Sequence, residues 1–381
     1  MGARHALGYA ALERAASSPA RLLAVCDPDL GRAADVAERF ASLCGRSPRV
    51  LPDLQAALEW AEVDAVDLVI PTRWHHEAAI AALRSGRHVL VEKPFALTIR
   101  ACRAMAEAAR ESGLTLAVAE NFRRIPTNRA LHAIVTGGVI GRPYAVSVQV
   151  VRQSSGPPSS EWYWDRRVVG SLPNLELAVH EVDLLRHLLG EVAEVHAVTG
   201  AIEGGPEDIG LAILRFVSGA FGEVMVLTSG HGGETDSRLL VGSKGRVSSR
   251  RWEGWEDGSI HLDSSDPITS ETWTRGWLAD LDPGQRDLLL PEGAWDETNL
   301  VVDIQDPLRY GIALELHDFA TAIGTGRKPE VGADAGTRSV AICLAILESA
   351  HRGGAPVAIA DVLDGRVRDW QADLDNELGL G

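Results

Sequence analysis

The chain has 381 residues, and its 37 Lys and Arg against 53 Asp and Glu give a formal net charge of −16. Hydrophobic residues make up 45% of it and charged residues 24%, an ordinary globular composition, and the length suggests two domains. The negative charge argues against a nucleic-acid-binding protein, because such proteins present a basic face to phosphates. No apolar run approaches the roughly 20 residues of a membrane helix, and the first residues lack a signal-peptide pattern. We therefore expect a cytoplasmic protein that contacts neither nucleic acid nor membrane.

The cysteines give no sign of a structural framework. They are scattered, without CxxC spacing, at Cys26, Cys44, Cys102 and Cys343. This pattern predicts reduced thiols and excludes a zinc site of the usual spacing. We predict no metal site.

Apolar strands alternate with amphipathic helices over residues 1–122. The predicted strands are Arg21–Asp27, Ala65–Pro71, Arg87–Val91 and Leu114–Ala119, and the predicted helices are Ala6–Ala16, Ala33–Leu43, His76–Ser85 and Ile99–Ser112. Strands separated by helices of this length form right-handed βαβ units with a buried parallel sheet. We therefore predict an α/β protein whose N-terminal domain, residues 1–122, is a Rossmann-type dinucleotide-binding domain.

The pattern changes in residues 123–381, which we predict to form an α+β substrate and oligomerisation domain. Successive strands are predicted at Tyr144–Val151, Val192–Ala201, Gly210–Phe216, Ala220–Ser229, Arg238–Val241 and Arg246–Arg250. Short turns between them indicate an open, mainly antiparallel sheet, which a helix near Pro173–Leu189 would cover. Residues 257–306 have weak periodicity and suggest an insertion or lid. Helices at Leu308–Gly324 and Ala335–His351 are expected to pack back on the first domain.

Polar residues follow the strands of the first domain. Asp27 ends one strand, Pro71-Thr72 ends another, and Glu92-Lys93-Pro94 ends a third. Ligands of doubly wound folds bind at the carboxyl ends of the strands, where an acid accepts hydrogen bonds from the adenosine ribose. Asp27 fits that role, although a turn residue is an equally good explanation of Asp27 alone.

The glycine-rich turn of a dinucleotide site is mostly absent. Gly2 fits the last glycine of such a turn, with the following helix directing its amino end at a pyrophosphate. The first strand and the first two glycines would then lie upstream of residue 1. We therefore expect the functional polypeptide to start before Met1.

Taken together, these motifs resemble the Gfo/Idh/MocA oxidoreductases, the family of glucose–fructose oxidoreductase and inositol dehydrogenase. The resemblance covers nearly the whole chain and is strongest in an apolar strand that ends in Glu-Lys-Pro, followed later by His-x-x-Asp-Leu. The matching segments are Gly2-x-x-His5, Asp27-Pro28-Asp29, Pro71–His75, Val91–Pro94, Asn121–Arg124, Gly138–Gly141, His180–Leu184 and the late helix Glu315–Gly326.

The resemblance implies NAD as cofactor, with NADP disfavoured because Asp27 would repel a 2′-phosphate. The cofactor-binding residues that it implies are Gly2, His5, Asp27, Pro71, Thr72, His75, Glu92, Lys93 and Asn121. Lysine occurs in this arginine-rich chain only at Lys93, Lys244 and Lys328. The presence of a lysine at position 93 in such a chain favours a functional role for Lys93, since a lysine can lose its proton where an arginine stays charged.

The predicted helix of the second domain presents a polar stripe. Glu176, His180 and Asp183 are spaced i, i+4, i+7, which places them on one face of an α-helix. A solvated stripe is the alternative explanation. The family usually has Asp four residues before the histidine and Gly two before it, whereas this chain has Glu176 and Ala178. The glutamate keeps the carboxylate but reaches one methylene further, so we expect the substrate pocket or the role of this acid to differ from the family pattern.

An aromatic and basic cluster precedes this helix. It comprises Trp162, Tyr163, Trp164, Arg166 and Arg167. Such side chains suit the faces of a sugar ring, and we expect Trp164, Arg166 and Asp183 to bind substrate; core packing is the alternative for the aromatic residues. The tryptophans Trp252, Trp255, Trp273, Trp277 and Trp295 suggest the same role or a subunit interface.

The function expected from the resemblance is NAD-dependent hydride transfer involving a secondary alcohol of a sugar, glycoside or cyclitol. One alternative is an enzyme that uses NAD transiently to cleave or epimerise a glycoside. Another is a non-catalytic dinucleotide-binding sensor, which would have little reason to keep Lys93 and His180. Because an open sheet face needs cover, we expect a homodimer or homotetramer.

Oxidation of an alcohol needs a base beside the hydroxyl group. We assign His180 as this base, because the ordinary pKa of imidazole suits neutral pH. Lys93 would stabilise the developing alkoxide as a cation, and Glu176 would orient the imidazole or bind a neighbouring hydroxyl. In the alternative assignment, Lys93 with a lowered pKa is the base and His180 only positions the substrate.

Overall fold

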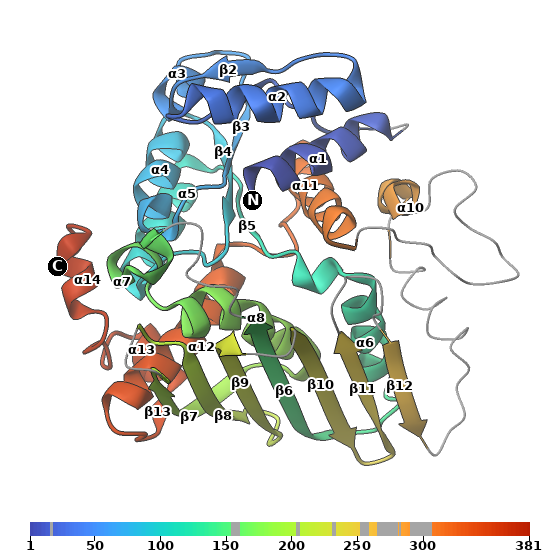
Figure 1. Ribbon diagram of the computed structural model, residues 1–381, viewed down its shortest axis with the longest axis vertical. Helices are drawn as coiled ribbons and strands as arrows, with labels where there is room; N and C mark the ends of the chain where they lie inside the picture. The colour runs from blue at the N-terminus through green and yellow to red at the C-terminus, as the bar shows by residue number, and fades with distance from the viewer. Residues whose placement is uncertain are drawn as a thin grey trace, which may run out of the picture.

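The computed structural model describes residues 1–15, 18–153, 161–202, 206–230, 234–251, 259–264, 281, 283–289 and 307–381. Its N-terminal part alternates helices and strands as predicted (Figure 1). The elements are α1 (Gly2–Arg14), β1 (Ala24–Cys26), α2 (Leu30–Cys44), β2 (Arg49–Leu51), α3 (Leu54–Leu58), β3 (Ala65–Leu68), α4 (His75–Arg84), β4 (His88–Glu92), α5 (Ile99–Ser112) and β5 (Leu116–Ala119). The short β2 and α3 were not predicted from the sequence.

All strand pairs in this domain are parallel, but they form two sheets. β1 pairs with β2, and β3, β4 and β5 form the second sheet in that order. β1 and β3 are not paired with each other. The expected strand ahead of residue 1 stays a prediction.

Local signals in the sequence set the ends of the helices. The Asp29 side chain accepts hydrogen bonds from the backbone N–H groups of Gly31 and Arg32 and so caps α2. Thr98 caps α5 in the same way, and α5 ends at Gly113, which has a left-handed backbone (φ 68°). These caps explain why Ile99–Ser112 is a helix with the predicted bounds.

The second part is an open sheet of eight strands in the order β12-β11-β10-β6-β9-β8-β7-β13, antiparallel except for the pair β6·β9. The strands are β6 (Pro143–Gln153), β7 (Val192–Gly200), β8 (Ile209–Phe216), β9 (Phe221–Gly230), β10 (Thr235–Gly242), β11 (Gly245–Arg251), β12 (Ser259–Ser264) and β13 (Val357–Ala358). The predicted mainly antiparallel sheet is confirmed. β12 lies in the segment predicted as an insertion and instead extends the sheet.

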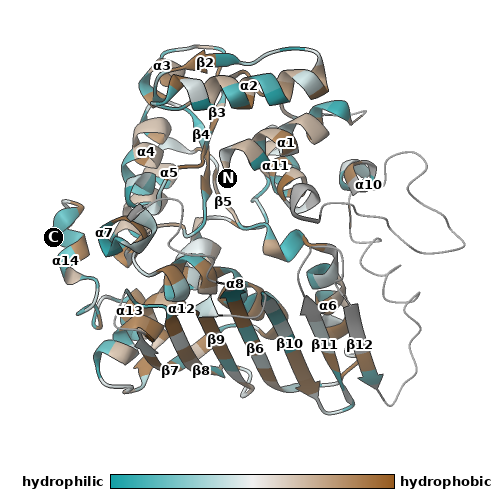
Figure 2. Ribbon diagram, viewed as in Figure 1, coloured by the Kyte–Doolittle hydropathy of each residue, from teal (hydrophilic) through white to brown (hydrophobic). Residues whose placement is uncertain are grey.

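Helices cover one face of this sheet. They include α6 (Pro126–Thr136), α8 (Ala178–Leu189), α12 (Ala333–His351) and α13 (Ile359–Leu363), and α12 packs on both β7 and α8 (Figure 1). Along β8, Ala212, Leu214 and Phe216 are buried under them, while Leu211 and Ile213 are exposed on the opposite face. Apolar residues therefore line both faces of the central strands (Figure 2).

The late helices link the two parts. α11 (Pro307–Thr325) packs against α1, and α12 also packs against α5. The remaining short elements are α7 (Arg166–Val169), α10 (Pro283–Leu289) and α14 (Ala372–Glu377), with single helical turns at Thr72–Trp74, Phe122–Arg124 and Glu161–Trp164. Among the described helices, none is long and apolar enough to cross a bilayer. The predicted domain boundary at residues 122 and 123 stays a prediction, and the tryptophans of residues 252–295 lie outside the described residues.

Candidate active site

Functional side chains gather where β3, β4 and β5 end. Thr72 lies just beyond β3, Lys93 follows β4, and Glu120 and Asn121 follow β5. Glu92 is paired with Ala119 in the sheet, so Lys93 and Glu120 each directly follow the last paired residue of two adjacent strands. The polar strand ends thus meet at one edge, as the fold requires.

Lys93 and Thr72 both contact Glu176, which belongs to the other domain. The ammonium Nζ of Lys93 donates to the backbone oxygen of Glu176 over 2.8 Å and lies 3.4 Å from its Oε2. The hydroxyl of Thr72 donates to Glu176 Oε1 over 2.5 Å. Burial alone would lower the pKa of Lys93, but the carboxylates of Glu176, Glu92 and Glu120 outweigh it and raise the pKa. Lys93 therefore stays a cation.

The segment that holds Glu176 is not a regular α-helix. Leu172–Leu177 form a π-helix that continues into α8 at Ala178, and Ser171 caps it by accepting from the N–H of Asn174. The wider turns of a π-helix change the direction of its side chains. Glu176 contacts Lys93, His180 contacts Glu120, and Asp183 contacts Arg123. The three partners all lie just after β4 or β5, so the common face expected for Glu176, His180 and Asp183 stays a prediction.

His180 is held by the segment that follows β5. Its Nδ1 lies 2.7 Å from Oε1 of Glu120, which is 2% exposed. The ring of Phe122 stacks on the imidazole with centroids 4.0 Å apart and planes at 12°. Nε2 of His180 has no hydrogen-bond partner within the described ranges. With Nδ1 protonated toward Glu120, Nε2 is left as the basic nitrogen.

His5 lies in a buried acidic cluster beside Lys93. Its Nδ1 contacts Asp67 over 2.8 Å, and its Nε2 contacts Glu92 over 2.9 Å. Burial alone would lower the pKa of His5, but Asp67 and Glu92 raise it well above its ordinary value. Burial raises the pKa of Glu92, whereas His5 and Lys93 lower it more strongly, to about 2. The cluster places the first turns of α1 against the end of β4.

Glu315 of α11 completes this cluster. Its Oε1 is 3.9 Å from Nε2 of His5, and both of its oxygens are buried without hydrogen-bond partners in the described part of the chain. Burial raises its pKa well above the ordinary value. Burial therefore favours the neutral form of the Glu315 carboxyl group relative to an exposed one.

Three predicted site residues have other contacts. Asp183 is buried against Arg123 (2.8 Å) and Ser339 (2.7 Å), so its carboxylate is used inside the fold. Arg166 pairs with Asp373 and lies over the ring of Trp370. The nitrogens of the fully buried His75 face the backbone oxygens of Ile70 and Pro94. The geometry thus argues against substrate contacts of Asp183 and Arg166 and a cofactor contact of His75.

The other predicted residues remain available to ligands. Asn121 is buried, and its Oδ1 has no hydrogen-bond partner in the described segments. Asp27 is half-buried beyond β1, with Oδ1 accepting from the N–H of Asp29 over 2.8 Å. Trp164 is half-buried. Gly2 is the first residue of α1, and Pro71 precedes the turn that holds Thr72.

Sequence reasoning missed Glu120 and Phe122. Glu120 directly follows a predicted strand, in the same position as Lys93 after its own strand, so the strand-end rule could have found it. Phe122 stacks on His180 through the tertiary fold alone, and no sequence signal points to that contact.

Comparison with known proteins identifies the family. Residues 1–120 match the model of an oxidoreductase family with an NAD-binding Rossmann fold, and residues 128–248 match the GFO/IDH/MocA C-terminal domain. Inositol 2-dehydrogenase 2 of Saccharopolyspora erythraea is 30% identical over 65% of this chain and 73% of its own length. The chain belongs to the Gfo/Idh/MocA family.

Other members of the Gfo/Idh/MocA family are also similar. Levoglucosan dehydrogenase of Pseudarthrobacter phenanthrenivorans is 30% identical over 61% of this chain and 66% of its own length. 1,5-Anhydro-D-fructose reductase of Ensifer adhaerens is 35% identical over 42% of this chain and 50% of its own. The chain thus matches about half to two thirds of the length of these relatives. A structure of levoglucosan dehydrogenase with NADH and levoglucosan has the same fold, with a TM-score of 0.74, 24% identity, and coverage of 94% of this chain and 96% of that one.

Proposed function

We propose that this protein is an NAD-dependent oxidoreductase that transfers a hydride between nicotinamide and a secondary alcohol of a sugar, glycoside or cyclitol. The observation on which the proposal rests is that cationic Lys93, from the nucleotide domain, contacts the helical segment that leads to His180. Alcohol oxidation requires a base that accepts the hydroxyl proton and is helped by a cation that stabilises the alkoxide. Here the two groups would come from different domains. The printed names of the relatives, which include levoglucosan and inositol dehydrogenases, support this substrate class.

The residues at the strand ends fit a dinucleotide. Oδ1 of Asn121 and Oε2 of Glu120 are buried polar atoms without partners in the described structure, so this edge offers acceptors to a ligand. α1 begins at Gly2, and His5 in the same helix contacts Glu92, which brings the amino end of α1 toward the site (Figure 1). Helix amino ends favour phosphate. When bound, the nicotinamide accepts or returns the hydride.

The protein side chains would divide the proton chemistry between them. Nε2 of His180 accepts the hydroxyl proton of the substrate, while Nδ1 stays bonded to Glu120. Lys93 stabilises negative charge on the same substrate oxygen. The raised pKa of Lys93 disfavours the alternative in which Lys93 is the base. Glu176 holds Lys93 and Thr72 and does not orient His180.

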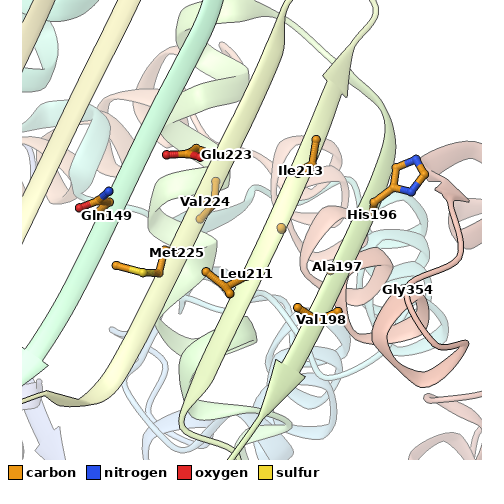
Figure 3. A pocket seen from close by; sticks show the side chains of 11 residues that line it. Gln149, His196, Ala197, Val198, Leu211, Ile213, Glu223, Val224, Met225 and Gly354 are labelled. Atoms are coloured by element: carbon orange, nitrogen blue, oxygen red, sulfur yellow. The ribbon is translucent and has the colours of Figure 1, made fainter.

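We also propose that the open sheet face binds a second copy of the chain. Val198, Leu211, Ile213 and Phe221 are 43–57% exposed there. Val198, Leu211 and Ile213 line a hollow of about 380 Å³ together with Met225 and Glu223 (Figure 3). Monomers seldom expose a contiguous apolar surface of this kind, and a symmetric dimer would cover the same patch on both chains. A homodimer or homotetramer follows.

The cytoplasm is the proposed location. Four cysteines, Cys26, Cys44, Cys102 and Cys343, are free thiols. Free thiols persist in a reducing compartment. Fractionation of cells that express the protein from its own promoter would test the location.

A substrate panel tests the proposed activity. Inositols, pyranoses, glycosides and anhydro sugars are incubated with NAD or NADP, and the nicotinamide absorbance is followed. We expect NADH from at least one secondary alcohol. Substrate consumption without NADH would indicate the transient use of NAD, and no reaction with any compound would contradict the proposal.

A further inference from the structure

We propose that Glu120 is a positioning residue for the base of the reaction, so that the nucleotide-binding domain orients His180 of the substrate domain. The inference rests on the proposed function and deepens it. Oε1 of Glu120 accepts from Nδ1 of His180 over 2.7 Å and from the N–H of Phe122 over 3.0 Å. The second contact fixes the carboxylate itself.

Three features of one short segment hold the imidazole. Glu120 fixes one edge of the ring, Phe122 stacks on its face, and the Glu120 carbonyl accepts from Nη1 of Arg124 over 2.8 Å. Arg124 is in turn anchored to Asp318 of α11 over 3.0 Å. The segment after β5 is thus tied into the core. A rigid partner that accepts from Nδ1 selects the tautomer with its free electron pair on Nε2.

Other carboxylates near His180 have different partners. Glu92 is bonded to His5 and to the N–H of Lys93. Glu176, on the same helical segment as His180, accepts hydrogen bonds from Thr72 and Lys93. Glu120 is therefore the carboxylate that contacts His180 within the described ranges.

The charges around His180 come from three elements. Glu120 follows β5, Glu92 and Lys93 lie at the end of β4, and Glu176 precedes α8. The carboxylate of Glu120 favours a positive imidazole, which is the form His180 takes after it accepts the substrate proton. Removing this charge should disfavour that form, and the acidic limb of the pH–rate profile should move to lower pH.

Variants of Glu120 test the proposal. Glu120→Ala removes the acceptor and the charge, and Glu120→Gln keeps the shape and an acceptor without the charge. Glu120→Asp keeps the charge on a shorter side chain. The matched control is Glu348→Gln, which alters another buried glutamate that accepts from the N–H of Trp370 and from Gln371. Thermal unfolding of each variant reports on folding.

Kinetics supply the first measurement. We expect Glu120→Ala to lower kcat about 10²-fold, within the range of acid–base effects, with a smaller change in KM. Glu120→Gln should move the acidic limb of the profile, and Glu120→Asp should restore its position at reduced kcat. A folded Glu120→Ala variant with the kcat and pH profile of Glu348→Gln would overturn the proposal.

Nitrogen NMR of the histidine rings supplies a second measurement that needs neither substrate nor cofactor. Loss of a signal in His180→Ala assigns His180 among the 12 histidines. We expect a proton on Nδ1 in the wild type and in Glu120→Gln, and mixed tautomers in Glu120→Ala. An unchanged His180 signal in all variants would overturn the proposal even if no substrate were found. If Glu120→Ala does not fold, the isosteric Glu120→Gln still tests the effect of the Glu120 charge, because the pH titration of the His180 signal can be compared with the wild type. An unchanged titration would also overturn the proposal.

Discussion

Lys93 donates to the backbone carbonyl oxygen of Glu176 over 2.8 Å across the boundary between the two parts of the chain. This contact does not depend on the side chain at position 176, so the longer acid there leaves it intact. The glutamate side chain accepts from Thr72 through Oε1 and also lies 3.4 Å from Lys93 through Oε2. Residue 176 thus joins the two domains through both its backbone and its side chain.

The Thr72–Glu176 hydrogen bond should stabilise the folded protein. Thr72→Val and Glu176→Asp each remove it, because valine lacks the donor and aspartate is one methylene shorter. We expect each change to lower the free energy of unfolding by about 1 kcal/mol. Chemical denaturation of both single variants and the double variant measures the coupling. Strictly additive effects would show that the two side chains do not interact.

The His5 cluster should make stability depend on pH. The raised pKa of His5 means that its contribution is fully present below pH 6.5 and is lost as the pH rises through the higher folded value. The lowered pKa of Glu92 means that its contribution is present above pH 4.5 and is lost as the pH falls toward about 2. His5→Gln should therefore lower the free energy of unfolding most between pH 4.5 and 6.5, by on the order of 3 kcal/mol.

Denaturation of the wild type and His5→Gln across this pH range measures the difference. Glu315→Gln is a useful companion, because burial raises the pKa of Glu315 and a glutamine mimics its protonated form. We expect Glu315→Gln to stabilise the protein more at alkaline than at acidic pH. A stability difference between wild type and His5→Gln that does not vary with pH would contradict the charge assignment.

Asp27 should favour NAD over NADP. One of its oxygens accepts from the N–H of Asp29, and a 2′-phosphate brought to this strand end would meet a like charge. Asp27→Ala should therefore narrow the preference for NAD, as measured by kcat/KM with each cofactor. A wild-type protein that uses NADP equally well, or an unaltered preference in the variant, would show that Asp27 does not select the cofactor.

The open sheet face should hold the oligomer together. Leu211 is 43% exposed and lies opposite Val198 and Met225, so Leu211→Arg places a charge on the apolar patch without burying it in the monomer. We expect light scattering to show a smaller assembly than the wild type. Val217→Arg, at a position 71% exposed beyond the end of β8, is the control that should keep its size. An identical mass for all three proteins would place the interface elsewhere.

Much of the fold could be predicted because apolar periodicity and caps lie within short segments. Ile99–Ser112 has a capping threonine before it and a glycine after it, and both are visible in the sequence. β2 was missed because Arg49–Leu51 is short and largely exposed, which leaves no apolar run. Lys93 was predictable as a polar residue at a strand end.

The remaining features of the site depend on tertiary contacts. The i, i+4, i+7 rule assumes α-helical turns, whereas Leu172–Leu177 is a π-helix, and no local pattern in the sequence indicated these wider turns. Asp183 has a distant partner in Arg123, and no local pattern indicates that ion pair. The strand-end rule marks Glu120 as a candidate, but its contact with His180 depends on the tertiary fold.

The most direct test of the proposed chemistry is a single turnover with a substrate deuterated at the reacting carbinol carbon. The wild type, Lys93→Ala and His180→Ala are mixed with NAD, and mass spectrometry follows deuterium in the reduced cofactor. We expect transfer by the wild type, with the rate lowered about 10²–10⁴-fold in each variant, while His180→Ala still binds NAD. Wild-type turnover without deuterium in the cofactor, or undiminished transfer in both variants, would contradict the account.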